Sequence, residues 1–254
     1  MKKLSLVILL TILFLEGFAQ GEIDTEKKIL YRNEWSIGML LKTNGLDFDY
    51  RSGKFVNYFK KNLWECGLGF IKHPQQYRAS NPYVTGYRQY CFGKKNFCFE
   101  LFYSRGRQRS LFTKQDLNSV EIRLFYFGGA TLAFLKPIYY EISYNDNIKS
   151  EKFDPVNHYA GITLGPSSFA KGFDEISVVP GIQCKAGLSF EFGKSDKKLT
   201  ALEAGFKLSA FTKKLEIMEQ KSNPQFIGNL FLTMRFGRVK HGAQYEYLNK
   251  YEDY

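Results

Sequence analysis

The chain has 254 residues, a formal net charge of +11 and an aromatic content of 17%. Its 24 Phe, 17 Tyr and 22 Gly, set against only 7 Pro, favour β structure. After residue 20 no apolar stretch approaches the length of a spanning helix, which excludes a helical inner-membrane protein.

The N-terminus resembles a secretory signal peptide. Two lysines precede an apolar run from Leu4 to Leu15, and the small residues Gly17 and Ala19 predict cleavage near residue 20. The run is too short for a membrane anchor, so we interpret 1–20 as the signal peptide and 21–33 as a periplasmic N-terminal segment. In an exported protein, the positive charge indicates outer-membrane lipid, lipopolysaccharide or acidic protein partners, and no nucleic acid.

Segments of strand-like composition, each bounded by turn residues, follow along the chain. The ten candidates are Trp35–Lys42, Leu46–Phe55, Leu63–Lys72, Tyr87–Phe92, Phe97–Phe112, Val120–Leu135, Ile138–Tyr144, Ile176–Phe192, Leu199–Phe211 and Phe226–Arg238. A polar tail, 239–254, comes after the last candidate.

The stretch "GIQCKAGLSFEFG", 181–193, alternates between apolar and polar or small residues. Successive side chains of a strand point to opposite faces, so one face of this strand is continuously apolar. The other face carries Lys185 and Glu191 among glycine and serine, which is too little charge for a fully solvated surface. We therefore expect the apolar face to contact lipid. Its members are Ile182, Cys184, Ala186, Leu188, Phe190 and Phe192.

The lengths of the connections predict a topology. With the mature chain starting in the periplasm, the short turns "FKKN", "GKKN", "KP" and "GKSDKK" fall on the periplasmic side. The longer connections 73–86, 113–119, 145–175 and 212–225 then fall outside, an asymmetry typical of outer-membrane barrels. We predict an all-β, antiparallel up-and-down transmembrane β-barrel of about ten strands over 34–238, with eight strands as the alternative. Residues 239–254 are then a periplasmic tail, and a soluble β fold is the competing interpretation.

A narrow lumen requires its charges to pair, because an unpaired buried charge is costly. The first and last strands, near Trp35 and Phe236, are expected to pair and close the barrel. The residues expected in the lumen are Glu65, Glu100, Glu121, Arg123, Lys185, Glu191, Glu203, Lys207, Arg235 and the bulky Phe231.

Aromatic residues near strand ends are expected to form a membrane-interface girdle. They are Trp35, Trp64, Tyr87, Tyr90, Tyr139, Tyr140 and Tyr144. The basic segment "YSRGRQR" is either simply solvated or holds lipopolysaccharide phosphates through Arg105, Arg107 and Arg109.

The cysteines and histidines offer limited chemistry. Cys66 and Cys184 fall on the apolar faces, whereas Cys91 and Cys98 flank a turn and form either a cross-strand disulfide or two free thiols. A lipase-type enzyme needs a histidine beside a serine, but no serine lies close in sequence to the three histidines. These are His73 and His158 in outer loops and His241 in the tail. We therefore assign no catalytic, cofactor-binding or metal-binding residues.

Four segments together resemble a family of small outer-membrane β-barrel proteins of Bacteroidota. They are "FIKHPQQYRASNPY", "VEIRLFYFGGATLAFLKPIYYEI", "FAKGFDEISVVPGIQCKAGLSFEFG" and "LTALEAGFKLSAF". The resemblance covers most of the mature chain and implies a barrel in the outer membrane. It also implies a role as the integral barrel subunit of either the β-barrel assembly machinery or the type IX secretion system.

Two functional hypotheses of different classes follow, with a third beside them. The first is a non-enzymatic docking or accessory subunit of an outer-membrane assembly or secretion complex, which binds partners through its long outer loops. The second is a lipid-active enzyme, of lipase or lipid A deacylase type, that uses a loop histidine. The third, a narrow pore, is disfavoured by the bulk of Phe231 and the charges in the predicted lumen.

Overall fold

The computed structural model describes residues 33–57, 59–78, 80–81, 89–113, 120–144, 147–154, 161–192, 198–219 and 222–240. Within these residues the chain forms eleven strands. They are β1 (Asn33–Lys42), β2 (Gly45–Asn57), β3 (Lys60–Ile71), β4 (Asn96–Phe112), β5 (Glu121–Pro137), β6 (Tyr139–Tyr144), β7 (Asn147–Lys152), β8 (Thr163–Pro166), β9 (Ser177–Phe192), β10 (Lys198–Phe211) and β11 (Phe226–Lys240). No helix in the described part of the chain is long and apolar enough to cross a membrane.

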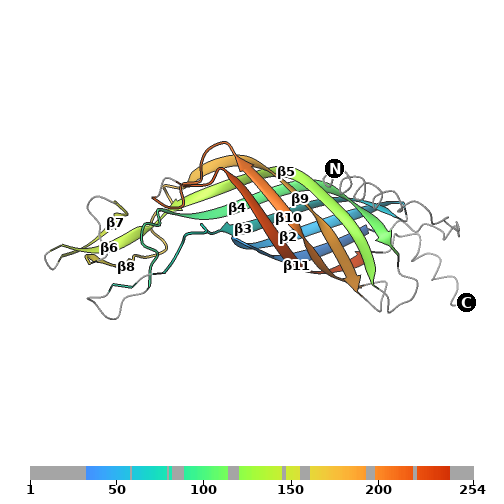
Figure 1. The fold of residues 1–254 in the computed structure, drawn as a ribbon, viewed down its shortest axis with the longest axis horizontal. Helices are drawn as coiled ribbons and strands as arrows, with labels where there is room; N and C mark the ends of the chain where they lie inside the picture. Colours follow the sequence, from blue (N-terminus) through green and yellow to red (C-terminus); the bar gives the residue numbers. More distant parts are fainter. Residues whose placement is uncertain are drawn as a thin grey trace, which may run out of the picture.

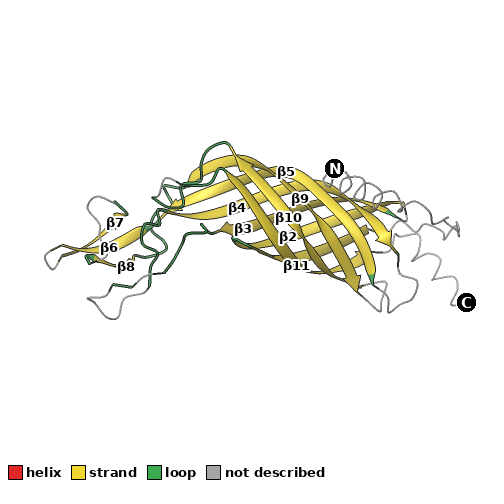
Figure 2. Cartoon of the chain, viewed as in Figure 1, coloured by secondary structure: helices red, strands yellow, loops and turns green. Residues whose placement is uncertain are grey.

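Eight strands close into an antiparallel barrel in the order β1-β11-β10-β9-β5-β4-β3-β2 (Figures 1 and 2). The first and last barrel strands pair as predicted, with Trp35 opposite Arg238 and Lys42 opposite Phe231. Closure gives every barrel strand two hydrogen-bonded neighbours, which removes the free edges of the sheet. The preferred prediction of ten strands is wrong, and the eight-stranded alternative is correct.

The two surplus candidates are short segments that do not belong to the barrel. A strand needs about 9–11 residues to cross a bilayer, and both Tyr87–Phe92 and Ile138–Tyr144 are shorter than that. Most of the second segment is β6, which pairs with β7 and β8 in a separate three-stranded sheet. The described residues of the first, Gln89–Phe92, form no barrel strand.

With eight barrel strands instead of ten, several connections lie at the opposite end of the barrel from the one predicted. We call the end where β1 begins and β11 ends the base, and the opposite end the rim. The connections 58–59, 113–120 and 193–197 lie at the base, whereas 43–44, 72–95, 138–176 and 212–225 lie at the rim. The prediction that 113–119 lies with the long outer loops is therefore wrong, as is the placement of "GKKN" and "KP" among the short periplasmic turns. Even so, the longest connections share one end.

Side chains alternate between a polar lumen and an apolar outer wall. In β9, Ile182 is 69% exposed and Leu188 points outward, whereas Lys185 is only 2% exposed. In β1, Ile37, Met39 and Leu41 are likewise exposed. This is the reverse of a soluble β fold and the arrangement that a barrel spanning lipid requires. The predicted sidedness of 181–193 is confirmed.

The second sheet lies beyond the rim and has its own apolar core (Figure 1). Its strand order is β7-β6-β8. The core residues are Tyr90, Ile138, Tyr140, Ile142 and Phe153, with Phe92, Phe97 and Ile162 packed against them. Because Tyr90 and Phe92 come from the 72–95 connection, two long rim connections build this unit together.

Candidate functional site

The centre of the lumen is filled by ion pairs that cross it. Arg51 of β2 donates to Glu203 of β10 at 2.6 Å and to Glu65 of β3 at 3.1 Å. Lys185 of β9 approaches the same Glu65 carboxylate at 2.6 Å. Each of these side chains is almost completely buried, so each charge is compensated by a partner inside the barrel.

Arg235 of β11 extends the same central network. Its guanidinium lies 2.7 Å from Asp49 and 3.1 Å from Glu203, and it also donates to the Ser36 hydroxyl. With Arg235 and Asp49 included, three cations and three carboxylates meet at the centre. Their formal charges cancel.

A second network lies nearer the rim. Lys42 of β1 contacts Asp47 at 2.6 Å and Glu100 of β4 at 3.1 Å. Lys207 of β10 contacts the same two carboxylates at 3.0 and 3.1 Å. The Thr131 hydroxyl donates to Glu100 as well. The formal charges of these two lysines and two carboxylates again cancel.

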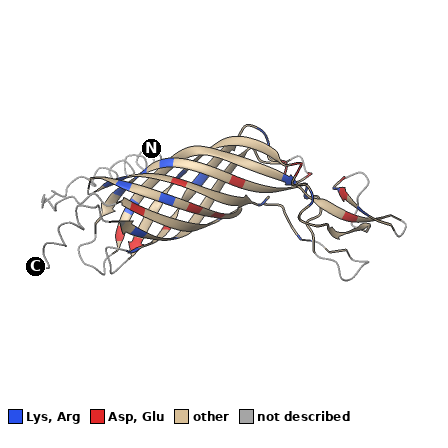
Figure 3. Cartoon of the chain, turned by 180° about the vertical axis from the view of Figure 1, so that it is seen from behind, with Lys and Arg blue, Asp and Glu red and all other residues tan. Residues whose placement is uncertain are grey.

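The base side of the lumen holds smaller pairs. Lys61 donates to Glu34, and Arg123 lies 2.7 Å from Glu121 and 3.4 Å from Glu191. Figure 3 marks the charged positions of the strands from base to rim. All the predicted lumen residues therefore point inward. Six further charged side chains, which the sequence prediction did not include, also point into the lumen: Glu34, Lys42, Asp47, Asp49, Arg51 and Lys61.

Aromatic rings fill the space between these networks. Phe125, Phe127 and Phe231 are buried in the lumen, and the Arg51 guanidinium lies 4.7 Å from the centre of the Phe127 ring. The Lys185 ammonium lies 5.0 Å from the same ring. Ion pairs and rings occupy the middle of the lumen, a packing that disfavours conduction.

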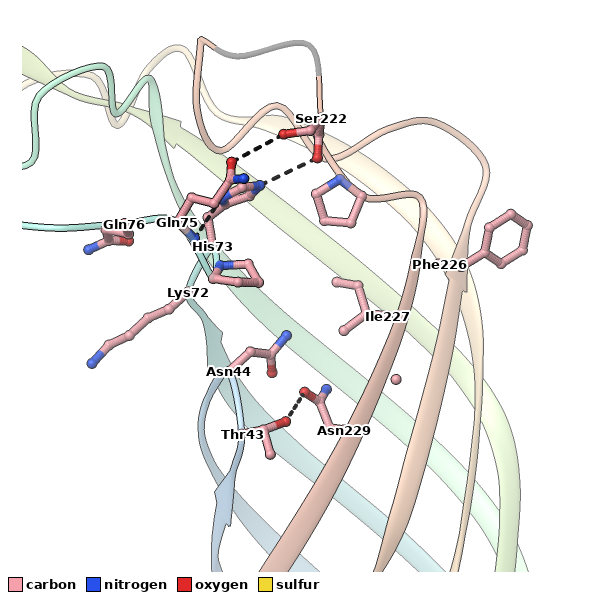
Figure 4. A pocket seen from close by; sticks show the side chains of 13 residues that line it. Thr43, Asn44, Lys72, His73, Gln75, Gln76, Ser222, Phe226, Ile227 and Asn229 are labelled. Carbon is pink, nitrogen blue, oxygen red and sulfur yellow. Dashed lines mark hydrogen bonds between the residues drawn. The ribbon is translucent and has the colours of Figure 1, made fainter.

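A cleft opens at the rim between the 43–44 turn, the start of the 72–95 connection and the 212–225 connection (Figure 4). Its volume is about 630 Å³. The Thr43 hydroxyl donates to Asn229 Oδ1 at 3.0 Å, and the Lys72 amide donates to the Asn44 carbonyl at 2.7 Å. These bonds hold the β1–β2 turn against β3 and β11 on either side of the cleft.

His73 lies in this cleft, but its geometry does not match a Ser–His catalytic pair. Its Nδ1 accepts the Gln75 amide at 3.2 Å, and its Nε2 lies 3.4 Å from the backbone carbonyl of Ser222 (Figure 4). The Ser222 hydroxyl contacts Gln75 Oε1 instead of the imidazole. An imidazole that donates through Nε2 to a carbonyl has no free nitrogen to activate a nucleophile. His158 and His241 lie outside the described residues.

The segment between β8 and β9 is tied to the barrel by a lysine surrounded by rings. The Lys136 ammonium, at the rim end of β5, donates to the Lys171 carbonyl at 2.8 Å. It also lies 4.4 Å from the centre of the Phe169 ring, 4.9 Å from that of Phe173 and 5.8 Å from that of Phe97. These cation–π contacts attach the segment before β9 to the outer wall.

Hydrogen bonds tie the 72–95 connection to the same sheet. The Tyr140 hydroxyl reaches the carbonyls of Cys91 at 2.9 Å and Lys94 at 2.8 Å. Asn81 donates to the carbonyls of Gly161 and Thr163. Burial raises the pKa of Tyr140, which keeps the phenol protonated as a donor. Burial also lowers the pKa of Lys94 to about 8.

The described cysteines are all free thiols. Cys66 and Cys184 lie on the outer wall, as predicted. Of the two alternatives for Cys91 and Cys98, the structure has separate thiols. Cys98 points into a buried apolar cluster at the rim, whereas Cys91 accepts a hydrogen bond from Gln76. No metal-binding group of side chains occurs in the described ranges.

The predicted aromatic girdle is only partly correct. Trp35 and Trp64 lie on the outer wall, where Tyr50 and Tyr103 complete a row of rings across β1 to β4. Tyr90 and Tyr140 instead lie in the core of the second sheet, and Tyr139 and Tyr144 lie on β6. Tyr87 lies outside the described residues.

The arginines of "YSRGRQR" do not lie in a rim loop. Arg105, Arg107 and Arg109 project outward from the base half of β4. The signal peptide 1–20, the N-terminal segment up to residue 32 and the tail from residue 241 lie outside the described residues, so these expectations stay predictions.

No family model matches the chain, and no curated protein does either. Solved structures similar to it include Ail of Yersinia pestis in complex with the heparin analogue sucrose octasulfate, at 9% identity and a TM-score of 0.42, covering 84% of this chain and 100% of that one. Neisserial surface protein A is 8% identical with a TM-score of 0.39, covering 84% and 98%. The N-terminal β-barrel domain of Pseudomonas aeruginosa OprF is 8% identical with a TM-score of 0.36, covering 82% and 97%.

Proposed function

We propose that the chain is a non-enzymatic β-barrel of the outer membrane that serves as a docking subunit of a protein assembly or secretion complex. The base faces the periplasm and the rim faces the exterior. The apolar outer wall and the neutralised lumen support the membrane location. Residues 1–20 supply export as a signal peptide, and the tail 239–254 is periplasmic.

The second sheet is the single observation that supports docking. A barrel needs only short connections to close, yet this chain builds a separately cored sheet beyond the rim from two long connections. Loops of this length in compact proteins are usually functional. The sheet contacts the barrel at the start of β4, where Phe97 packs against its core and the Tyr140 hydroxyl reaches the Lys94 carbonyl just before that strand.

The exposed strand β7 is the best contact surface on this sheet. It lies at an edge in the order β7-β6-β8, and no described strand pairs with its outer side. Ile148 is 56% exposed beside Lys149 and Lys152. An edge strand with unpaired backbone groups can accept a strand from a partner.

Photo-cross-linking in the native host tests this function. A photoreactive amino acid at Ile148 is expected to capture one outer-membrane or surface protein in stoichiometric amount. The same probe at Lys213, an exposed rim position on a different connection, serves as the control. Copurification in mild detergent, followed by mass spectrometry, then identifies the partner.

A deletion variant separates docking from folding. Replacement of 139–175 by a short Gly-Ser linker leaves all eight barrel strands in place. We expect this variant to keep heat-modifiable migration on a gel but to lose the partner. A partner that stays bound without the second sheet contradicts the docking role. A monomer whose lipid hydrolysis is lost in His158→Ala would replace it with the enzyme alternative.

A further inference from the structure

On the described barrel strands, acidic residues lie on one face only, whereas basic residues lie on both faces. Every Asp and Glu of these strands points into the lumen. The exposed charged side chains of the outer wall are all basic, and all lie in the base half. We call them the cation belt: Lys54, Lys60, Arg105, Arg107, Arg109, Lys198 and Arg238. In the described part of the chain, none of the seven forms a salt bridge.

The register places cations of the belt directly opposite one another. Lys60 of β3 pairs with Arg109 of β4, and Lys198 of β10 pairs with Arg238 of β11. Like charges at directly opposite positions of an antiparallel pair repel each other and destabilise it. An anion bound between the members of each pair would relieve this repulsion at two separate parts of the wall.

Aromatic rings place the belt at the level of lipid headgroups. Trp64 lies opposite Arg105, and Trp35 lies opposite Arg238. The Arg105 guanidinium also donates to the Tyr103 hydroxyl at 3.1 Å. Tryptophan and tyrosine prefer the boundary between hydrocarbon and headgroups, so the neighbouring cations reach the phosphate layer.

The rim offers no comparable surface on its outer wall. Lys136 is the outward lysine at the rim end of the strands, and it is only 2% exposed. The rings of Phe169 and Phe173 cover its ammonium, and the Lys171 carbonyl accepts its hydrogen bond. Among the described barrel strands, the exposed outward cations therefore all lie in the base half.

We propose that the cation belt binds the phosphate groups of anionic phospholipids in the leaflet at the base of the barrel. This inference rests on the proposed function for the membrane location and for the orientation of the base toward the periplasm. Arginine donates two parallel hydrogen bonds to a phosphate, and lysine supplies a compact charge beside it. Each cross-strand pair forms one headgroup site, with Trp35 or Trp64 packed against the adjoining glycerol and acyl region.

Native mass spectrometry of lipid retained by the purified full chain tests the belt. The protein in mild detergent is mixed with equal amounts of phosphatidylglycerol and phosphatidylethanolamine. We expect preferential retention of phosphatidylglycerol, weakening as salt concentration rises. In Lys60→Gln/Arg109→Gln, and separately in Lys198→Gln/Arg238→Gln, retention at the altered site is expected to fall about tenfold.

The control variant removes the same number of positive charges from a region outside the cation belt. Lys213→Gln/Lys214→Gln alters two exposed lysines of the 212–225 connection at the rim and is expected to retain phosphatidylglycerol as the unaltered chain does. Equal retention of both lipids, or an equal loss in the control, overturns the proposal. Lipopolysaccharide that displaces phosphatidylglycerol from the unaltered chain but not from the belt variants overturns the leaflet assignment.

Folding is scored independently in every sample. Heat-modifiable migration shows whether the barrel has formed. Its absence in the unaltered chain refutes the membrane barrel itself, whereas a folded barrel without lipid preference refutes only the belt. If a double variant does not fold, the salt dependence of phosphatidylglycerol retention by the unaltered chain tests the proposal instead. Retention that does not change with salt concentration rejects phosphate binding by the belt.

Discussion

The barrel and the second sheet use strands of similar composition but bury opposite kinds of side chain. In β1 of the barrel, Ile37 is 53% exposed while Glu34 and Lys42 are buried. In β6 of the second sheet, Ile142 is completely buried, whereas the polar residues on either side of it, Glu141 and Ser143, are partly exposed. Alternating strands of one chain therefore bury polar side chains in the barrel and apolar side chains in the second sheet.

The medium around each unit accounts for the difference. Lipid solvates the apolar wall of the barrel, so the polar side chains must find partners within the lumen. Water surrounds the second sheet, so its apolar side chains gather into a core. A strand of this protein does not specify by itself which face is inside, because the surrounding medium decides this.

The largest expected effect comes from the centre of the lumen. Glu203→Ala leaves both Arg51 and Arg235 short of a carboxylate, and we expect a loss of about 3–5 kcal/mol in the free energy of unfolding. Urea unfolding in lipid vesicles, followed by the fluorescence of the two tryptophans on the outer wall, measures it. Glu216→Ala, which alters an exposed pair outside the barrel, is the control. Equal losses in the two variants would show that the lumen charges are not structural.

The next effect compares the same substitution in the two regions. Leu232→Arg puts a charge on the lipid face of β11 and is expected to cost about 2–4 kcal/mol near the bilayer midplane. Ile148→Arg, at a similarly exposed position on β7, is expected to change stability by less than about 0.5 kcal/mol. Membrane insertion and heat-modifiable migration give the comparison. If both variants insert equally well, the outer wall does not contact lipid.

A smaller effect is expected within the second sheet. Tyr140→Phe leaves the carbonyls of Cys91 and Lys94 without their phenol donor, at an expected cost of about 1–2 kcal/mol. Faster hydrogen exchange in β6, with no change in β4 or β5, is the expected observation. Tyr144→Phe, at the exposed end of β6, provides the matched control. Faster exchange in the barrel strands as well would mean that the two units unfold together.

The smallest effect is expected at an exposed ion pair near the rim. Lys95 lies 3.0 Å from Glu216, and Glu216→Gln is expected to cost less than about 1 kcal/mol because water and salt screen the pair. The hydrogen bond to Glu216 raises the pKa of Lys95 above its ordinary value of 10.5. The contribution of the Lys95–Glu216 pair to the free energy of unfolding is therefore complete below pH 10.5. It is lost only as the pH rises past the raised pKa of Lys95. Urea unfolding of the variant at pH 6 and pH 9 should give the same difference from the unaltered chain.

The sequence predicts the sidedness of the strands well. Alternation in β3, β9, β10 and β11 identifies the lipid face, and closure between β1 and β11 follows from the need to satisfy the backbone. The length of Ile138–Tyr144 also carried a signal against a spanning strand, because a bilayer crossing needs more residues. The turn residues that bound this segment favour a strand, but its length is too short for a bilayer crossing.

The partners of the lumen charges are harder to predict. The sequence predicts that Lys185 finds a partner in the lumen but does not identify that partner, Glu65 of β3, which lies across the lumen from β9. Alternation tells which side chains point inward, but not which of them meet in a narrow interior. For the same reason, the shared core of the 72–95 and 138–176 connections was not predictable, since no periodic pattern links Tyr90 to Phe153.

The ion pairs of the lumen also have a consequence for the order of folding. Arg51 and Glu203 are 152 residues apart in sequence, and Lys207 and Asp47 are 160 apart. Lys42 pairs with Asp47 within hairpin β1–β2, and Arg235 pairs with Glu203 within hairpin β10–β11. Asp49, Arg51 and Lys207, however, form ion pairs with strands outside their own hairpins, so they stay hydrated until those strands arrive. Contacts this distant in sequence form slowly. Barrel closure, the loss of water from the lumen and charge neutralisation therefore occur together in one late step. A partly assembled sheet, whose inward charges are still hydrated, is not stable in the hydrocarbon of the membrane.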